Sequence, residues 1–179
     1  MRFASTLLLA GLLCLTFAEP TLASDPDPND VISPEAIVAA TYKSIERAPG
    51  QPYDWERFRA LFLPEALMVP NAEQTSGTTQ ILTPQGFVDW VNKVAPAGQP
   101  GDRGFAEEVV NNEIHRFGDV AQVFSTYQKR FYDDPRILGR GINSFQLLFR
   151  DGRWWIVSII WDEEVGAGPI PDRYLGDGK

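Results

Sequence analysis

The sequence predicts an α+β domain in which three N-terminal helices pack on one face of a curved, mainly antiparallel sheet. Three observations lead to this fold class. Residues 33–95 contain three segments whose apolar residues recur at helical spacing. Residues 105–164 contain four long segments in two pairs, each pair joined by a two-residue turn, as in β-hairpins. The predicted order is helix, helix, short strand, helix and four strands, and segregated helices and strands indicate α+β architecture.

Each predicted helix begins at a capping residue. Ser33-Pro34 and Thr83-Pro84 combine an N-cap side chain with proline at the first helical position, and Asp54 caps a shorter helix. The apolar stripes of the three helices are Val38, Thr41, Tyr42 and Ile45, then Trp55, Phe58, Leu61 and Phe62, then Phe87, Trp90, Val91 and Val94. Pro64-Glu65 is expected to stop the second helix, and residues 66–69 form a short strand.

The last two predicted strands form the hairpin GINSFQLLFRDGRWWIVSIIWDEE, residues 141–164. Asp151-Gly152 is typical of a type I′ turn, which pairs Arg150 with Arg153 and sends alternate side chains to opposite faces. One face then carries Asn143, Phe145, Leu147, Phe149, Trp154, Ile156, Ser158, Ile160 and Asp162. The other carries Ile142, Ser144, Gln146, Leu148, Trp155, Val157, Ile159 and Trp161. Both faces are mostly apolar, so we expect both to be covered.

The preceding hairpin turns at Gly118-Asp119 between residues 105–117 and 120–131. A two-residue turn there places Glu108 opposite Lys129 and Glu107 opposite Arg130, and these opposite-charge pairs favour the register. The apolar face then includes Asn112, Ser125 and Tyr127, whereas His115 lies on the wetter face beside Glu113 and Gln122. Residues 133–140 are expected to form a polar loop.

Residues 1–24 have the order of a secretory signal peptide: a positive start, an apolar run and a small-residue exit. An uncleaved membrane anchor is the alternative, although the run is short for a bilayer span. The signal predicts a secreted or periplasmic protein. We expect residues 25–32 to be a flexible leader, residues 33–164 to be the domain, residues 96–104 to form a mobile lid, and residues 165–179 to be a surface tail.

Composition excludes several function classes. The formal net charge is −8 and no basic block occurs, which argues against nucleic acid and against anionic membranes once the signal is removed. His115 is the single histidine, and the single cysteine, Cys14, leaves with the signal, so no zinc or copper site and no disulfide are expected. No phosphate loop, dinucleotide fingerprint or nucleophile elbow is present, so no cofactor is implied.

The chain resembles the nuclear transport factor 2-like (NTF2-like, SnoaL-like) superfamily in three stretches. These are DWERFRALFLPEA (residues 54–66), HRFGDVAQVFSTY (residues 115–127) and the 141–164 hairpin. The resemblance covers residues 33–164 and is most similar to secreted members of undefined activity. It implies a cone-shaped fold with a pocket between helices and sheet, and a homodimer formed through the sheet. The superfamily includes isomerases, dehydratases, cyclases and binders without catalysis, so the fold does not define the activity.

The predicted registers assign polar residues to the pocket face. Asp162 and Tyr127 are the candidates for proton transfer, because a carboxylate beside Trp161 would have a raised pKa; a solvated or paired strand-end carboxylate is the alternative. The candidate ligand-binding residues are Tyr42, Trp55, Asn112, Ser125, Asn143 and Ser158. The expected dimer interface is Trp155, Val157, Ile159 and Trp161, unless Tyr174 and Leu175 of the tail cover them.

The branches of the superfamily give two further comparisons. His115 would match the histidine–aspartate pair of the dehydratase branch only if a bulge turned it into the pocket. Tyr42 matches the phenol of the ketosteroid isomerase branch, but residues 66–71 offer no carboxylate base. The function that we expect is binding of a small apolar molecule without a cofactor. The alternatives are a lyase or isomerase using the pocket Asp and Tyr, and a structural module whose cone is filled by its own side chains.

Overall fold

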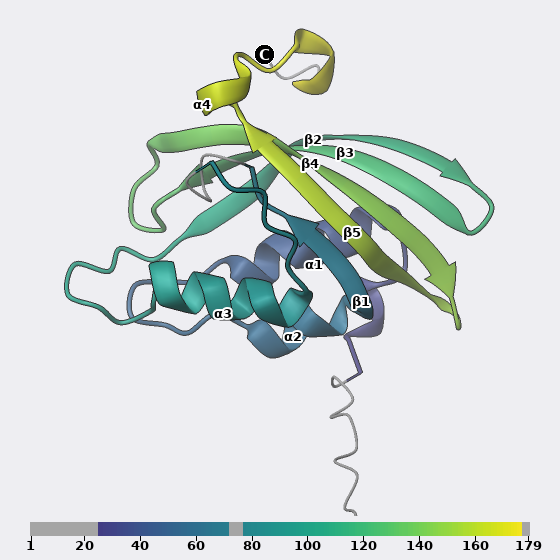
Figure 1. Cartoon of the computed structure of the whole chain (residues 1–179), viewed down its shortest axis with the longest axis horizontal. Helices are drawn as coiled ribbons and strands as arrows, with labels where there is room; N and C mark the ends of the chain where they lie inside the picture. The colour runs from purple at the N-terminus through teal and green to yellow at the C-terminus, as the bar shows by residue number, and fades with distance from the viewer. Residues whose placement is uncertain (1–24, 72–76, 177–179) are drawn as a thin grey trace, which may run out of the picture.

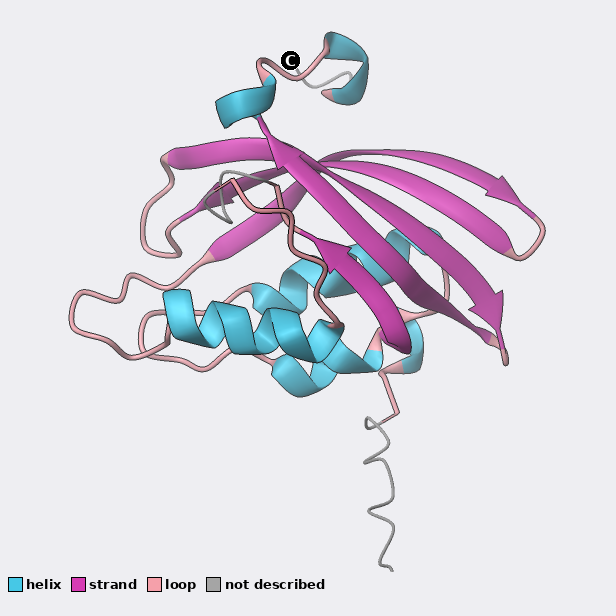
Figure 2. Cartoon of the chain, in the orientation of Figure 1, coloured by secondary structure: helices cyan, strands magenta, loops and turns pink. Residues whose placement is uncertain are grey.

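The computed structural model of the chain describes residues 25–71 and 77–176. It has an α+β fold, the predicted class, with one curved five-stranded sheet and helices against its concave face (Figures 1 and 2). The elements in chain order are η1 (Pro28–Asp30), α1 (Pro34–Ile45), α2 (Trp55–Ala60), β1 (Phe62–Val69), α3 (Pro84–Val94), β2 (Ala106–Phe117), β3 (Val120–Arg130), β4 (Ile137–Arg150), β5 (Arg153–Glu163), α4 (Glu164–Ala167) and η2 (Asp172–Tyr174). The predicted signal peptide, residues 1–24, lies outside the described residues.

The three predicted helix starts are confirmed by their caps. Side-chain oxygens of Ser33, Asp54 and Thr83 accept backbone N–H groups three residues along the chain, at 3.0–3.1 Å. The second helix is shorter than predicted, because the chain changes to strand β1 at Phe62 and not after Pro64. A proline is tolerated there because β1 is an edge strand, whose outer side needs no ladder hydrogen bond.

The sheet has the strand order β1-β5-β4-β3-β2 and is antiparallel except for the parallel pair β1 and β5. Both predicted hairpin turns are confirmed, with Arg150 opposite Arg153 and Phe117 opposite Val120. Asp151 and Gly152 both have positive φ (54° and 80°), as a type I′ turn requires. Strand β4 begins at Ile137, so the second half of the expected 133–140 loop is strand.

A bulge in β5 overturns half of the predicted register of the last hairpin. Leu147 pairs with Ile156, but Gln146 pairs with Ser158, so Val157 is an extra residue in β5. Because side chains alternate with period two, every residue beyond the bulge changes face. Ile159, Trp161 and Glu163 therefore point toward the helices. Ser158, Ile160 and Asp162 point away, opposite to the prediction.

A second bulge, at Val110 in β2, corrects the register of the other hairpin. Ile114 still pairs with Val123, but Val109 takes the place opposite Tyr127 that was predicted for Val110. The predicted charge pairs are wrong in consequence, since Glu107 lies opposite Lys129 and Glu108 opposite Gln128. Glu107 now shares the helix-facing side with Tyr127.

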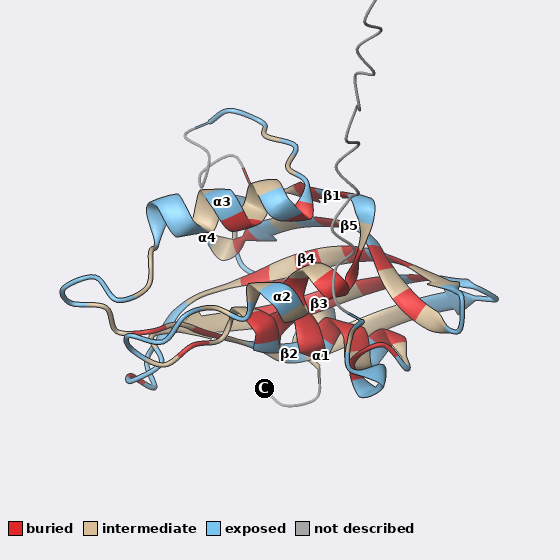
Figure 3. Cartoon of the chain, turned by 90° about the horizontal axis from the view of Figure 1, so that it is seen from below, coloured by how far each residue is buried: buried red, intermediate tan, exposed pale blue. Residues whose placement is uncertain are grey.

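The solid part of the core lies toward the Asp151-Gly152 end of the sheet. Trp154, Ile156, Phe145 and Val123 are each no more than 1% exposed and belong to one hydrophobic cluster with residues of α1 and α2. Figure 3 colours the buried stretches of the helices and the sheet red. The segment before α1 takes part in this core, because Val31 is buried and its carbonyl accepts the Trp154 N–H at 2.9 Å. The C-terminal end of the expected leader, residues 25–32, is thus in contact with the core.

The tail returns across the convex face of the sheet, the face away from the helices (Figure 1). Thr126 donates its hydroxyl to the Tyr174 carbonyl at 2.6 Å, and the Tyr174 ring lies 5.3 Å from that of Phe124. Ile170 is buried. The tail thus covers the β3 part of this face and leaves Val157 on β5, and Phe117 and Val120 at the β2–β3 turn, exposed.

Candidate ligand pocket

A cavity of about 240 Å³ lies between the helices and the sheet, where α1 and α3 end and β2 begins. Its roof is aromatic and comes from the helices and the loop before α2. The roof side chains are Tyr53, Trp55, Phe58, Phe87 and Trp90, followed by Val91 and Val94 of α3. Tyr53 stacks on Trp55 at 4.5 Å, and the indole N–H of Trp55 donates to Asn92 of α3 at 3.0 Å, so neighbouring elements hold the roof in place.

The floor of the pocket is the sheet, and it contains a connected set of polar groups. Lys129 donates to both carboxylate oxygens of Glu163, at 2.6 Å to Oε2. The Tyr127 hydroxyl donates to the same carboxylate at 3.1 Å. Glu163 is only 9% exposed, and the charge-assisted bonds from Lys129 and Tyr127 offset the cost of burying it.

Two glycines of β4 allow these contacts, because β4 runs between the strands that carry the partners. A side chain at Gly141 would collide with the Asp162 carbonyl and approach the Tyr127 hydroxyl to 2.6 Å. A side chain at Gly139 would approach Lys129 to 3.0 Å. With no side chain at either position, Lys129 and Tyr127 reach across β4 to Glu163 on β5.

A second polar group joins α1 to the sheet floor. The Tyr42 hydroxyl donates to Ser125 Oγ at 2.9 Å and accepts from the Asn143 amide at 2.9 Å. All three side chains are nearly fully buried. Burial, foremost, raises the pKa of Tyr42 and of Tyr127 above the usual phenol value, so both remain protonated hydrogen-bond donors.

Glu107 is the pocket group with the most altered acid–base behaviour. Burial raises the pKa of this carboxyl from 4.5 to about 8, and the nearby Glu163 charge raises it further. Lys129 and the Asn143 side chain act in the opposite direction. A carboxyl with such a pKa can accept or donate a proton near neutral pH.

The loop that was expected to be a mobile lid is tied down at the pocket rim. Asp102 accepts from the Arg47 guanidinium at 2.7 Å and from the backbone N–H groups of Gly50, Gly98 and Gly104 at 2.8–3.1 Å. These bonds, with the Arg47 bond the largest, hold the pKa of Asp102 well below its usual range. The expectation of a free lid is therefore wrong for this segment.

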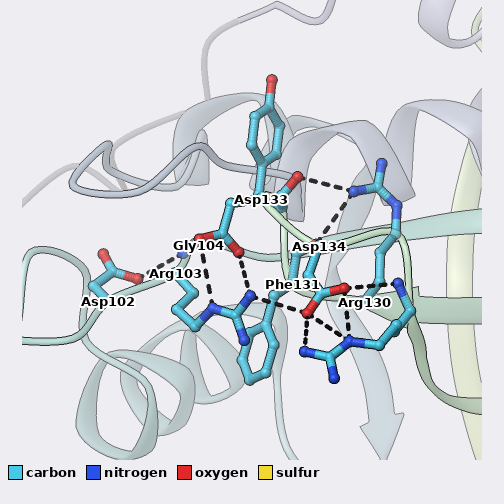
Figure 4. A network of polar contacts seen from close by, with 9 residues as sticks. Asp102, Arg103, Gly104, Arg130, Phe131, Asp133 and Asp134 are labelled. Carbon is cyan, nitrogen blue, oxygen red and sulfur yellow. Dashed lines mark hydrogen bonds and ion pairs between the residues drawn. The ribbon is translucent and has the colours of Figure 1, made fainter.

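A second network anchors the same loop to the segment between β3 and β4. The Arg103 guanidinium donates to Asp133 at 2.8 Å and to Asp134 at 3.1 Å, over the ring of Phe131 (Figure 4). Arg136 also bonds Asp134, and its hydrogen bonds lower the pKa of that carboxyl most strongly. The loop between α3 and β2 is thus held by ion pairs to segments that lie far from it in the sequence.

The structure brings some of the sequence-predicted site residues together and separates others. Tyr42, Trp55, Tyr127 and Asn143 line the pocket, and Ser125 lies beneath Tyr42 as its hydrogen-bond partner. Asn112 lies on the same face but is not part of the pocket lining, and its buried Oδ1 has no partner within residues 25–71 and 77–176.

Asp162 and Ser158 lie on the other side of the sheet, because of the Val157 bulge. Asp162 is exposed and accepts from the Asn71 amide at 3.3 Å and from the Glu163 N–H at 2.8 Å. Placing these two residues in the pocket was therefore an error of register.

The four expected interface residues are divided by the same bulge. Ile159 and Trp161 line the pocket, so their placement on the convex face is wrong. Trp155 and Val157 do lie on that face, with Arg153 stacked on the Trp155 ring at 3.6 Å. His115 is also on the convex face, opposite Gln122 and 3.1 Å from Glu113, as predicted.

The three charged residues of the pocket lining were missed by the sequence prediction: Glu107, Lys129 and Glu163. Glu163 was treated as part of a solvated acidic end, and Glu107 and Lys129 were given cross-strand partners that the Val110 bulge excludes. The available signal was the glycine pair Gly139 and Gly141 in a strand, since a strand glycine often marks close approach of another group.

Two absences concern the described residues alone. Within residues 25–71 and 77–176, no three side chains of the metal-ligating types converge. No helix in that part of the chain has the length and apolar character needed to span a bilayer.

Solved structures match this architecture, whereas no family profile and no curated protein matches the sequence. A Nostoc punctiforme protein of unknown function with a cystatin-like fold superimposes with a TM-score of 0.56 and 16% identity, over 72% of this chain and 86% of that one. A Thiobacillus denitrificans protein described as a calcium/calmodulin-dependent protein kinase type II association domain superimposes with a TM-score of 0.55 and 14% identity. The match covers 73% of this chain and 94% of that one. An NTF2-like protein of unknown function from Silicibacter pomeroyi superimposes with a TM-score of 0.49 and 17% identity. The match covers 72% of this chain and 91% of that one.

The fold of the chain therefore matches that of the Nostoc and Thiobacillus proteins, both of which superimpose with a TM-score above 0.5. At these identities the likeness shows the fold alone. The activity has to be argued from the pocket.

Proposed function

We propose that this protein is a secreted or periplasmic domain that binds a small molecule with an apolar body inside an NTF2-like cone. The ligand lies between the aromatic roof and the polar floor. The cavity volume of about 240 Å³ is below the roughly 300 Å³ at which pockets for drug-sized ligands begin, so the ligand is small.

The observation that carries this proposal is the incomplete burial of the apolar face of α3. Phe87, Trp90, Val91 and Val94 follow the stripe of an amphipathic helix, which ordinarily packs into a core. Here all four line the cavity, none is fully buried, and Val94 is 57% exposed. A ligand in the pocket would remove this apolar surface from water, and that gain favours binding.

The direct test is native mass spectrometry of the protein purified from its own source. We expect a mass increment that disappears on denaturation. Val91→Trp fills the cavity from the roof and should abolish the increment, with a circular dichroism spectrum like that of the wild type. Val157→Ala, on the opposite face, is the matched control and should retain it. No increment, together with no saturable change in tryptophan fluorescence from any small aromatic compound, would refute the proposal.

A second candidate function is proton-transfer catalysis, as in a lyase or isomerase, with Glu107 as the acid–base group. The observation that favours it is a carboxyl with a pKa of about 8 at the pocket surface. Tyr127 would then act as a positioning residue, since its proton is donated to Glu163. Turnover of a compound that binds, lost in Glu107→Gln but with binding retained, would distinguish the enzyme from a binder.

Export and homodimer formation belong to the same proposal. The 1–24 signal supports export, and N-terminal sequencing of the exported protein checks it. The exposed apolar side chains of Phe117, Val120 and Val157 on the convex face support a dimer through the sheet, in the area that the tail leaves open.

A further inference from the structure

The charges at the pocket floor do not balance once Glu107 is ionised. Glu107 and Glu163 then contribute two carboxylates, and Lys129 contributes the single ammonium group of the pocket lining. That ammonium group is bound to both oxygens of Glu163. Among the described residues, no ion pair joins a cationic side chain to Glu107, so this carboxylate has no counter-charge in direct contact.

The polar and titratable groups that interact with Glu107 come from α1, β3, β4 and β5. They are Tyr42 of α1, Tyr127 and Lys129 of β3, Asn143 of β4 and Glu163 of β5. Lys129 is the one cation in this set. With Glu107 ionised, the pocket therefore attracts one further positive charge and repels a further negative one.

The remaining wall suits a cation as well as an apolar group. The rings of Trp55, Trp90 and Trp161 line the cavity. The face of an indole ring attracts a positive charge, and this attraction grows when the site is shielded from water. Carboxylate and aromatic rings together form the combination that recognises organic ammonium groups.

We propose that the ligand of this pocket is a small organic monocation, an ammonium group attached to an aromatic or aliphatic body, whose charge pairs with Glu107. This inference rests on the proposed binding function and specifies its ligand class. An anionic ligand would have to displace Glu163 from Lys129, and a neutral ligand would leave the ionised form of Glu107 without a counter-charge.

The test uses three probes of similar size and different charge: benzyltrimethylammonium, 2-phenylethanol and phenylacetate. The quaternary ammonium keeps its charge at every pH, so any pH dependence of its binding comes from the protein. Binding to the purified protein is followed by tryptophan fluorescence and calorimetry from pH 6 to pH 9. Glu107→Gln is compared with Glu108→Gln, whose carboxylate lies on the exposed side of β2 and accepts from Gln128 at 2.7 Å.

We expect benzyltrimethylammonium to bind at least tenfold more tightly than 2-phenylethanol at pH 9. Because binding needs the ionised form of Glu107, its affinity should fall by about tenfold for each pH unit below 8. Glu107→Gln should remove both the preference and the pH dependence and still bind 2-phenylethanol. Glu108→Gln should behave as the wild type.

Two results separate the possible failures. Equal affinity for the cation and the alcohol in wild type and Glu107→Gln, or a preference for phenylacetate, would overturn the cation inference and leave the binding function in place. No binding of any probe, together with an empty protein in native mass spectrometry, would overturn both.

Discussion

Glu107→Gln should change how the stability of the ligand-free protein depends on pH. The pKa of Glu107 is raised from 4.5 to about 8 in the folded state, chiefly by burial. Below pH 4.5 the carboxyl is protonated in both the folded and the unfolded chain. Between pH 4.5 and pH 8 the unfolded chain releases this proton and the folded chain keeps it, so stability falls as pH rises, and the loss is complete above pH 8.

The magnitude follows from the two pKa values. At roughly 1.4 kcal/mol per pH unit, the wild-type protein loses about 5 kcal/mol of unfolding free energy from this group between pH 4.5 and pH 8. The neutral amide of Glu107→Gln does not titrate. The variant should therefore gain about 5 kcal/mol relative to the wild type over the same range, because the other groups titrate alike in both proteins.

Urea denaturation at pH 4.5, 6, 7, 8 and 9 measures this difference. Glu108→Gln, with its exposed carboxylate, should run parallel to the wild type within about 0.5 kcal/mol. If the difference between Glu107→Gln and the wild type changes by less than about 1 kcal/mol across the series, the burial argument for Glu107 is wrong.

Four further changes test other parts of the structure. Gly141→Ala would overpack against the Tyr127 hydroxyl and should lower the unfolding free energy by about 1–3 kcal/mol, whereas Gly86→Ala on α3, with room at 3.4 Å or more, should be near neutral in the same urea assay. Asp102→Asn removes the charge that pins residues 96–104, and hydrogen exchange of their amides should become roughly tenfold faster; unchanged exchange would mean that the loop is held by other contacts. Trp154→Ala should cost about 3–5 kcal/mol by calorimetric or urea unfolding, because this side chain is 1% exposed. Val157→Arg should convert the proposed dimer to monomer in sedimentation equilibrium, and a wild-type protein that sediments as a monomer would remove the dimer from consideration.

The elements and turns could be predicted because their causes are local. Ser33, Asp54 and Thr83 accept N–H groups three residues away, and Asp151-Gly152 adopts the two positive φ angles that its residue types favour. The end of α2 could not be predicted in the same way. Strand β1 replaces the helix from Phe62 onward because its pairing with β5 is worth more than local helix propensity.

The pocket could be predicted only in part, for a reason that concerns single residues. Tyr42 was placed correctly because the cap at Ser33 fixes the helix that carries it. Tyr127 and Asn143 were placed correctly because their own strands contain no bulge between these residues and the hairpin turns. The bulge at Val157 turns Asp162 out of the pocket and Glu163 into it, opposite to the prediction. Val157 is an apolar residue in an apolar strand, and its residue type gives no sign of a bulge. A bulge is favoured by the curvature of the whole sheet, so the local sequence carries little sign of it.

By itself the sequence determined the fold class, the helix starts, the two hairpin turns and the exposed position of His115, since capping, turn chemistry and side-chain period act over a few residues. The tertiary structure alone decided which carboxylates face the pocket. Two bulges placed Glu107 and Glu163 inside, and Gly139 and Gly141 let Lys129 and Tyr127 reach Glu163 across a strand. Those contacts join strands that meet only when the sheet is complete, and the charge imbalance that defines the proposed ligand arises from them.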